Sequence, residues 1–274
     1  MVEIIKKFKS VHNPDISYEM PLQLILSRPL NDIDLFIGYL NDHHPELTDS
    51  FCFMLCSKLE RITKDVIVET DIFESKPDNL ENYPSLEEVY KRAVLQVLGY
   101  ERYASDVIDG KAMFAYKDYL HSYLIPAAYM AETTVELLSR EEGLEFFRNY
   151  VDYKTDHEKA IEAHDSLEAL FDHLKSSSTE SPQEWSFYFG KDGAVYAKVA
   201  SCLWSEVLKE FDSEIAYAVA CHFDFNAAKH YNENFVLTRT KTIMQGNEYC
   251  DFCWRDTRLG NGSHPDDSFW EKLE

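Results

Sequence analysis

A serine-rich segment at residues 175–182 separates two parts of the chain whose hydrophobic patterns differ. Before it, apolar residues such as Leu86 and Val89 recur every three or four positions, a period typical of amphipathic helices. After it, the aromatic and β-branched runs 185–189 and 194–200 flank a Gly-Lys-Asp-Gly turn, which indicates a β-hairpin. The chain must therefore accommodate both a helical part and a part that contains a sheet.

The order of the predicted elements indicates an α+β fold. Two helices, 201–211 and 213–223, separate the hairpin from two more strands, 235–244 and 249–254, so the order is ββααββ and the sheet is antiparallel. We expect a largely helical N-terminal part to pack on this sheet. The elements expected in that part are helices at residues 32–40, 50–62, 85–97, 111–140, 141–152 and 156–174 and a short strand at 66–68.

Local signals set some of these boundaries. Ser85, followed three residues later by Glu88, forms a capping box at the start of a helix. Gly99 is a typical residue just beyond a helix end. Pro126 predicts a kink or a break in the helix that contains it, because proline cannot complete the helical hydrogen bonds.

These patterns predict a mainly helical region at residues 1–175, an α+β region at 183–254 and a C-terminal tail at 255–274. The glycine-rich sequence 260–263 predicts that the tail is flexible. Packing of all three regions into one compact domain stays open.

The charge of the chain excludes several classes of ligand. With 27 Lys and Arg against 49 Asp and Glu, the formal net charge is −22. Nucleic acids and anionic lipid surfaces both require a basic surface, so we expect neither as a partner. No apolar run has the roughly 18 residues that a membrane span needs.

The cysteine content indicates the compartment. The chain has six cysteines among 274 residues, far fewer per residue than a small secreted disulfide scaffold. We therefore expect free thiols and a cytoplasmic protein. Most of these thiols fit the role of small buried hydrophobic side chains.

Cys221, His222 and Asp224 form the first candidate site. They lie within one turn of the predicted helix 213–224, with Cys221 and Asp224 on one face and His222 beside them. A thiol, an imidazole and a carboxylate at this distance could act as nucleophile, base and anchor. The same spacing also fits a buried cysteine, a core histidine and a solvated carboxylate.

Arg239 is the second candidate. It lies in the predicted strand 235–244 on the same face as Leu237, whereas Thr240 and Thr242 point to the other face. An arginine between apolar neighbours suits a clamp for a carboxylate or phosphate, because its fork binds planar anions at two points. An edge-strand charge or an internal ion pair is the alternative.

Cys250 and Cys253 form a C-x-x-C pattern, which in many proteins binds zinc or carries redox chemistry. In the predicted strand 249–254, however, Cys250 and Phe252 face one way, while Asp251 and Cys253 face the other. Two thiols on opposite faces cannot share a metal ion or form an unstrained disulfide. We therefore predict neither a metal site nor a cofactor.

Four short motifs follow one another in the second part of the chain: Ser201-Cys202-Leu203-Trp204, Cys221-His222-Phe223-Asp224, Leu237-Thr238-Arg239-Thr240-Lys241-Thr242-Ile243-Met244-Gln245-Gly246 and Cys250-Asp251-Phe252. Together they resemble the C-terminal signature of the L-2-amino-thiazoline-4-carboxylic acid hydrolase family over about residues 199–254. The family pattern usually has arginine after the C-D-F motif, where this chain has Cys253.

The resemblance implies a small-molecule hydrolase that opens a cyclic isothiourea of the 2-aminothiazoline-4-carboxylate type at its amidine carbon, by breaking a C–N or a C–S bond. Such chemistry needs a nucleophile or an activated water, a carboxylate for the amidinium and a cation for the acid group. The residues of the chain that could supply these groups are Cys221 or Cys250 as thiol, Asp224 and Asp251 as carboxylates, His222 as proton carrier, and Arg239 with Thr240 and Thr242 as the substrate-binding groups.

Other functions remain open at this point. The cysteines and His222 could form a metal- or ligand-binding module without catalysis, and the acidic helical part could be a docking surface of a non-enzymatic protein. For the enzyme, we expect a small-molecule partner that carries a carboxylate. The sequence leaves a homo-oligomer open.

Overall fold

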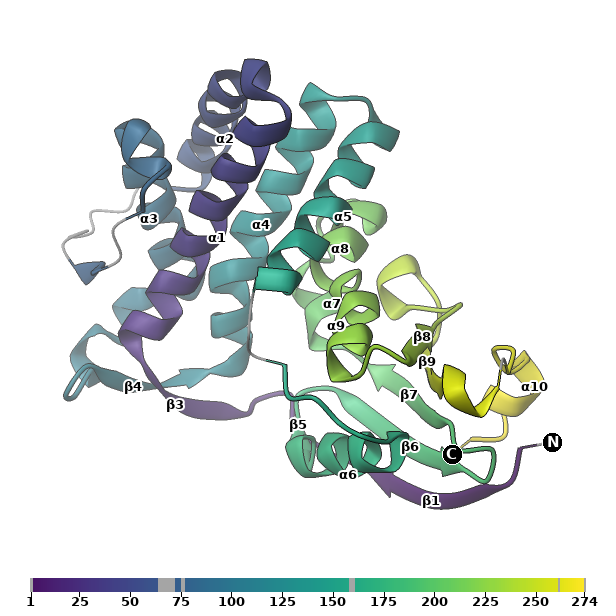
Figure 1. Ribbon diagram of the computed structural model, residues 1–274. Helices are drawn as coiled ribbons and strands as arrows, with labels where there is room; N and C mark the ends of the chain where they lie inside the picture. Colours follow the sequence, from purple (N-terminus) through teal and green to yellow (C-terminus); the bar gives the residue numbers. More distant parts are fainter. Residues whose placement is uncertain (1, 64–71, 75–76, 158–160, 261, 274) are drawn as a thin grey trace. The chain divides into compact units, whose positions relative to one another are not determined.

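The computed structural model describes residues 2–63, 72–74, 77–157, 161–260 and 262–273. The chain forms two compact units with interleaved segments (Figure 1). One unit contains residues 1–16, 152–209 and 221–274, and we call it the sheet unit. The other contains residues 17–151 and 210–220, and we call it the helical unit. The division that the sequence predicts, at residues 175, 183 and 254, stays a prediction.

The helical unit is built from amphipathic helices around an aromatic core. Phe36 is fully buried, and its ring lies 4.9 Å from Phe51 and 4.7 Å from Tyr150. The elements of this unit are β3 (Ser17–Pro21), α1 (Leu22–His43), α2 (Thr48–Ile62), α3 (Pro84–Leu98), β4 (Lys111–Ala115), α4 (Tyr116–Leu137), the first part of α5 (Arg140–His157) and α8 (Ser213–Ala220).

Several helix boundaries differ from the sequence prediction. Ser85 does not cap α3, because the helix begins at Pro84, whose fixed φ suits a first helical position. Gly99 adopts a left-handed conformation with φ of 67° after α3, which confirms its predicted role. Pro126 lies inside α4 without ending it. The predicted strand at 66–68 lies outside the described residues.

The sheet unit is organised by an antiparallel sheet of five strands in the order β1-β6-β7-β9-β8. The hairpin predicted around the Gly-Lys-Asp-Gly turn is present as β6 and β7, and Gly193 takes the positive φ that the turn needs. The elements of this unit are β1 (Ile4–Lys9), β2 (Val11–His12), α6 (Leu167–Ser177), β5 (Glu180–Ser181), β6 (Glu184–Gly190), β7 (Val195–Ser201), α7 (Leu203–Val207), α9 (Phe223–Tyr231), β8 (Phe235–Thr238), β9 (Cys250–Asp256) and α10 (Asp267–Trp270).

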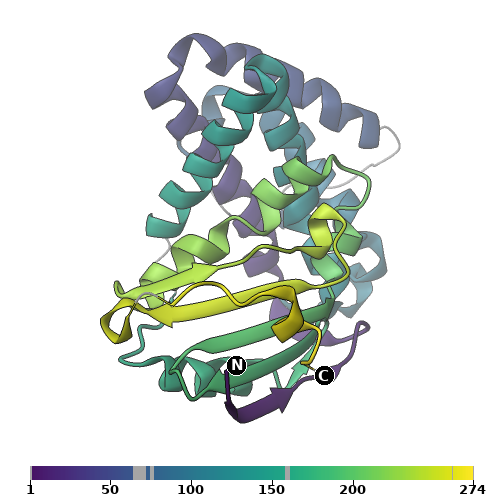
Figure 2. The same cartoon turned by 90° about the vertical axis from the view of Figure 1, so that its right-hand side faces the viewer.

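Each face of this sheet buries its own hydrophobic cluster. On the first face, Phe187, Phe252 and Trp254 pack with residues of α6 and α9, such as Phe171 and Ala228. The members of the cluster on the second face are Tyr188, Ala194, Tyr196, Cys253, Trp270 and Leu273. Figure 2 shows the C-terminal segment, in yellow, in front of the strands. The sheet is thus covered on both sides, and alternate residues of β9 serve different cores.

The α+β class is confirmed, but the order of elements after residue 183 is not ββααββ. The predicted helix 213–224 is two helices, because α8 ends at Ala220 and α9 begins at Phe223. The predicted strand 235–244 is also shorter, since β8 ends at Thr238. Cys221, His222 and Arg239 therefore lie at element ends rather than within regular elements.

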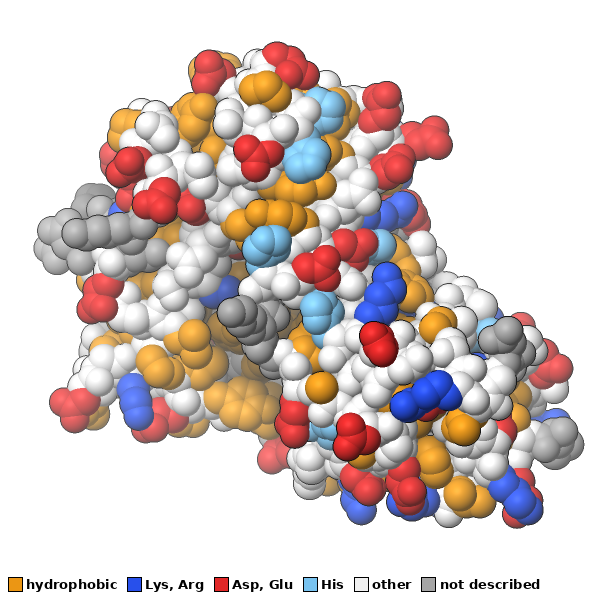
Figure 3. All heavy atoms as spheres, in the orientation of Figure 1, with side chains coloured by type: hydrophobic (Ala, Val, Ile, Leu, Met, Phe, Trp, Pro, Cys, Tyr) orange, Lys and Arg blue, Asp and Glu red, His pale blue; other side chains and the backbone are white. Residues whose placement is uncertain are grey.

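The surface agrees with the strongly acidic composition. Figure 3 shows acidic side chains spread over the face in view, with fewer Lys and Arg side chains between them. Among the described residues, no helix is both long and apolar enough to cross a membrane.

The C-terminal segment is docked on the sheet and is not the flexible tail that its glycines predict. The Trp270 ring is fully buried and lies 6.0 Å from Tyr196 in an edge-on arrangement. The Lys198 ammonium donates hydrogen bonds to the carbonyl oxygens of Trp270 and Leu273 at 3.0 and 3.1 Å. Local composition could not reveal this docking, because its partners lie about 70 residues earlier in the chain.

The docking predicts a large effect of truncating Trp270. We expect Trp270→Ala to lower the free energy of unfolding by about 3–5 kcal/mol, the typical cost of deleting a large buried aromatic side chain. Chemical denaturation followed by circular dichroism measures this change. Leu259→Ala is the matched control in the same segment, because Leu259 is 70% exposed. Equal stability of the two variants would show that the segment is loose in solution.

Candidate functional site

Arg239 and Asp224 form a close ion pair on the first face of the sheet. The Arg239 Nη1 group donates to Asp224 Oδ2 at 2.6 Å, and Nη2 donates to the carbonyl oxygen of Cys221 at 2.8 Å. The Arg239 side chain is 1% exposed, whereas the Asp224 side chain is 23% exposed. The arginine therefore lies behind the carboxylate, and only the carboxylate reaches the surface of the unit.

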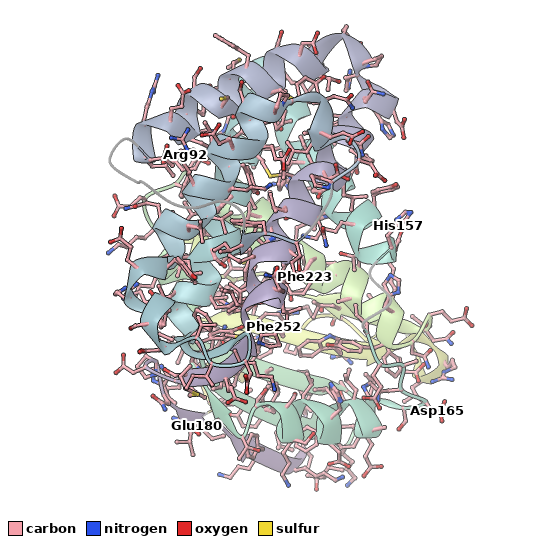
Figure 4. All side chains as sticks on the ribbon, turned by 90° about the vertical axis from the view of Figure 1, so that its left-hand side faces the viewer. Arg92, His157, Asp165, Glu180, Phe223 and Phe252 are labelled. Carbon is pink, nitrogen blue, oxygen red and sulfur yellow. The ribbon has the colours of Figure 1, made fainter. Side chains whose placement is uncertain are left out.

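Two aromatic rings hold the guanidinium of Arg239. Its central carbon lies 5.1 Å from the ring centre of Phe225 and 4.7 Å from that of Phe252. Phe252 is labelled in Figure 4, as is Phe223 at the start of α9. Cation–π contacts of this kind contribute about 0.5–2 kcal/mol each. The rings and the two hydrogen bonds fix the planar fork in one orientation.

The backbone around Arg239 leaves the sheet and is held by Asp251. The Asp251 carboxylate is fully buried and accepts hydrogen bonds from the N–H groups of Thr240 and Lys241 at 2.8 and 2.6 Å. It also accepts from the Thr240 hydroxyl at 2.5 Å and from His264 Nε2 at 2.9 Å. Burial raises the pKa of Asp251, but the hydrogen bonds from His264, Thr240 and Lys241 outweigh it, so the pKa is lowered overall.

Asp251 lies on the opposite face of β9 from the Arg239–Asp224 pair. Phe252, which contacts Arg239, belongs to the first cluster, whereas Cys253 belongs to the second. His264, the partner of Asp251, stacks on Trp270 of the second cluster at 5.5 Å. The three charged residues of the predicted site therefore do not share one cavity.

Three thiols lie near the ion pair. Cys202, Cys221 and Cys250 interact electrostatically with both Asp224 and Arg239. Burial raises the pKa of all three, to about 12 for Cys250 and well above the ordinary value for Cys221. These thiols are thus protonated at neutral pH. Cys253 lies in the cluster on the other face of the sheet, which confirms the predicted opposite orientation of Cys250 and Cys253.

His222 is oriented by a residue that the sequence analysis did not single out. Its Nε2 atom lies 3.2 Å from Asp152 Oδ2, and Asn226, one turn later on α9, donates to the Asp152 carbonyl oxygen at 3.0 Å. A second pair of the same kind joins His230 to Asp156 at 2.9 Å. Asp152 precedes His222 by 70 residues, so no local motif connects them.

The two threonines predicted to bind substrate have partners within the fold. The Thr240 hydroxyl is bonded to Asp251. The buried Thr242 donates to Gln245 Oε1 at 3.0 Å and accepts from the Gln245 N–H at 3.2 Å, so it caps a short 3₁₀ turn. Both hydroxyls stabilise the loop between β8 and β9.

The structure therefore brings together part of the predicted site. The predicted site residues that lie together on the first face are Cys221, Asp224, Arg239 and Cys250. Cys202, which was not among the predicted site residues, lies near them. His222 turns towards Asp152 on α5, while Asp251 and Thr240 organise the loop from the second face. Among the described residues, no three His, Cys, Asp or Glu side chains are placed to hold a metal ion.

Residues 119–254, just under half of the chain, match the family model for L-2-amino-thiazoline-4-carboxylic acid hydrolase. The match confirms the resemblance that the four motifs indicate and begins well before them, within α4. The region from residue 119 to 254 is therefore similar to this family. No curated protein and no solved structure was found to match the chain.

The bonds of Asp251 predict a pH-dependent loss of stability when its charge is removed. Asp251→Asn places an amide opposite two backbone N–H groups, and we expect it to lower the free energy of unfolding by about 2–4 kcal/mol near neutral pH. The pKa of Asp251 is lower in the folded state than in the unfolded state. Its charge therefore contributes fully to the free energy of unfolding above the unfolded-state pKa of about 3.9. This contribution is lost as the pH falls through the folded-state pKa. The difference between variant and wild type should shrink below about pH 4.

Denaturant titrations at several pH values measure this difference. Asp267→Asn is the control, because its carboxylate is exposed on the surface and pairs only with Lys241 among the contacts described. If the stability difference between Asp251→Asn and wild type did not change with pH, the shape of the Asp251 side chain, and not its charge, would stabilise the fold.

Proposed function

We propose that this chain is a small-molecule hydrolase that opens a cyclic isothiourea of the 2-aminothiazoline-4-carboxylate type, with its reaction centre at Asp224 in the sheet unit. The observation that carries the proposal is that the family-matched region supplies a partly exposed carboxylate that is paired with a buried arginine and lies near three thiols. The family match supports a hydrolase of this kind, and the ring type and the roles of individual residues are our proposal.

The reaction adds water to the amidine carbon, which is bonded to sulfur, to the ring nitrogen and to the exocyclic nitrogen. The water oxygen becomes a carbonyl oxygen, and one bond to that carbon breaks. Cleavage of the ring C–N bond leaves an S-carbamoyl group and a free amine. Cleavage of the C–S bond leaves an N-carbamoyl group and a free thiol.

Asp224 has two properties that this chemistry needs. Its side chain is partly exposed, and we propose that its carboxylate holds an amidinium or accepts a proton from the attacking water. Burial raises its pKa, and the adjacent Arg239 guanidinium opposes that effect. A carboxylate whose pKa is raised towards the working pH is a better general base than an exposed one.

Arg239 has a supporting role in this proposal. The sequence suggested a clamp for the carboxylate of the substrate, but its guanidinium is 1% exposed and is bonded to Asp224 and to the Cys221 carbonyl. We propose that Arg239 orients the Asp224 carboxylate and favours its ionised form. Asp251, Thr240 and Thr242 hold the loop that carries Arg239, and they support the reaction through this scaffold.

The state of the thiols favours water as the nucleophile. A thiolate is the reactive form of cysteine, and burial raises the pKa of Cys221 and Cys250 far from neutral. We propose that these thiols line the site as neutral groups and that His222, oriented by Asp152, carries protons to and from it. All six cysteines are free, which fits the reducing cytoplasm that we propose for this enzyme.

The direct test is an assay for ring opening of 2-aminothiazoline-4-carboxylate by the purified chain, with Asp224→Asn as the comparison. We expect Asp224→Asn to lower kcat by about 10²–10⁴-fold, because it removes the proposed base and the charge that faces the amidine carbon. A thiol reagent added after the reaction tells C–S cleavage from C–N cleavage. Equal kcat values for the two proteins would remove Asp224 from the reaction centre.

The two roles considered for Arg239 predict different kinetics. We expect Arg239→Lys to lower kcat by about 10–100-fold with little change in KM, because an ammonium cannot bond Asp224 and the Cys221 carbonyl in the planar arrangement of the fork. A clamp for the substrate carboxylate would instead raise KM at nearly constant kcat. Arg255→Lys is the control, since Arg255 pairs with Asp192 on another part of the sheet.

The proposed water nucleophile predicts that single thiols are dispensable. Cys221→Ser and Cys250→Ser should each retain kcat within about tenfold of wild type, provided that both variants fold. A covalent thiolate mechanism requires a loss of about 10⁴-fold or more in one of them. Cys253→Ser on the other face of the sheet controls for the effect of the substitution on stability.

A further inference from the structure

His264 reaches the scaffold of the site from outside the family-matched region. Its Nε2 atom lies 2.9 Å from Asp251 Oδ2, and its Nδ1 atom lies 2.9 Å from the hydroxyl oxygen of Thr238. Its ring stacks on the buried Trp270, with 24° between the two planes. Both ring nitrogens and one ring face are thus used to hold this side chain against β8 and β9.

His264 makes one of the two contacts that hold the second oxygen of the Asp251 carboxylate. Oδ1 accepts the N–H groups of Thr240 and Lys241, and Oδ2 accepts the Thr240 hydroxyl and His264. With Oδ2 held from the C-terminal segment, Oδ1 is directed at the two backbone N–H groups. The position of these peptide units therefore depends on the bond that His264 makes.

Arg239 directly precedes the backbone that Asp251 holds. The Arg239 side chain extends to the first face of the sheet, where it bonds Asp224 and contacts Phe252. A rotation of the peptide units at Thr240 and Lys241 would move the backbone from which Arg239 extends. A continuous series of contacts thus joins His264, Asp251, the loop backbone, Arg239 and Asp224.

We propose that His264 is a positioning residue of the site: by orienting Asp251, it fixes the loop from which Arg239 reaches Asp224. This inference rests on the proposed role of Asp224 in hydrolysis. It gives the C-terminal segment, which follows the family-matched residues 119–254, a part in the reaction centre. His264 acts through Asp251 and Arg239 and does not touch the substrate.

The pKa of Asp224 depends on the position of the Arg239 guanidinium and can therefore be used to detect its displacement. Among the described residues, Asp224 interacts electrostatically with Arg239, His222, Cys202, Cys221, Cys250 and Tyr231. Arg239 makes the direct bond at 2.6 Å and favours the ionised carboxylate, whereas burial disfavours it. Displacement of the guanidinium must therefore raise the pKa of Asp224.

The experiment follows the Asp224 carboxyl carbon by NMR in the full chain labelled with ¹³C-aspartate, with Asp224→Asn used to assign the signal. His264→Leu keeps packing on Trp270 but cannot donate to Asp251, and we expect it to raise the pKa of Asp224 by about 1 unit. His264→Gln keeps an N–H donor and should stay within about 0.3 units of wild type. Asp267→Asn, which breaks an exposed bridge between the same segment and Lys241, should leave the titration unchanged.

Two results would overturn the proposal. An unchanged Asp224 titration in His264→Leu, even with a lower melting temperature, would show that His264 only stabilises the fold. An equal shift in His264→Leu and His264→Gln would show that the hydrogen bond to Asp251 is not what matters. Should His264→Leu fail to fold, His264→Ala gives the same comparison with His264→Gln.

The titration needs no turnover, so it is independent of the proposed activity. A wild-type chain without ring-opening activity would contradict the proposed function, while the NMR titration would still decide whether His264 positions Arg239. With activity present, the acidic limb of the kcat profile should move to higher pH in His264→Leu by the same amount as the Asp224 titration. A structural loss alone would lower kcat at all pH values.

Discussion

The buried carboxylate of Asp251 is the interaction on which the candidate site depends. A fully buried carboxylate is stable only when its oxygens are bonded, and here two backbone N–H groups, a hydroxyl and a histidine meet this need. The same bonds make the chain leave the sheet after β8. The hydrogen bonds to Asp251 on one face of the sheet therefore hold the loop from which the Arg239 side chain extends to the other face. There the Asp224 carboxylate balances the charge of Arg239.

The sequence could predict what depends on local periodicity. The hairpin of β6 and β7, the helical N-terminal part and the alternation of Cys250 and Cys253 all follow from the spacing of apolar residues and turn residues. It could not predict where regular structure stops. The pattern of alternating residues predicts a strand through residue 244, but the strand ends at Thr238, and the next N–H groups bond to Asp251 instead.

The same limit applies to the residues of the candidate site. Cys221, Asp224, Arg239 and Cys250 lie in the motifs that resemble the family signature, and this resemblance makes them candidates. Asp152 and His264 act through contacts that span 70 and 13 residues, and neither belongs to a recognisable pattern. The glycines near residue 260 predict flexibility, because the composition of a segment indicates how freely its backbone can move. Composition does not indicate the hydrogen bonds to distant residues that hold the segment in place.

The position of Arg239 also shows how a very acidic chain can maintain a buried cation. Desolvating a guanidinium costs several kcal/mol, so its donors and faces need partners. Asp224 and the Cys221 carbonyl supply acceptors, and Phe225 and Phe252 supply aromatic faces. The pair places a partly exposed carboxylate, whose charge is balanced by the buried guanidinium, beside protonated thiols. In the proposed function, this carboxylate holds the amidinium of the substrate, which is a planar cation.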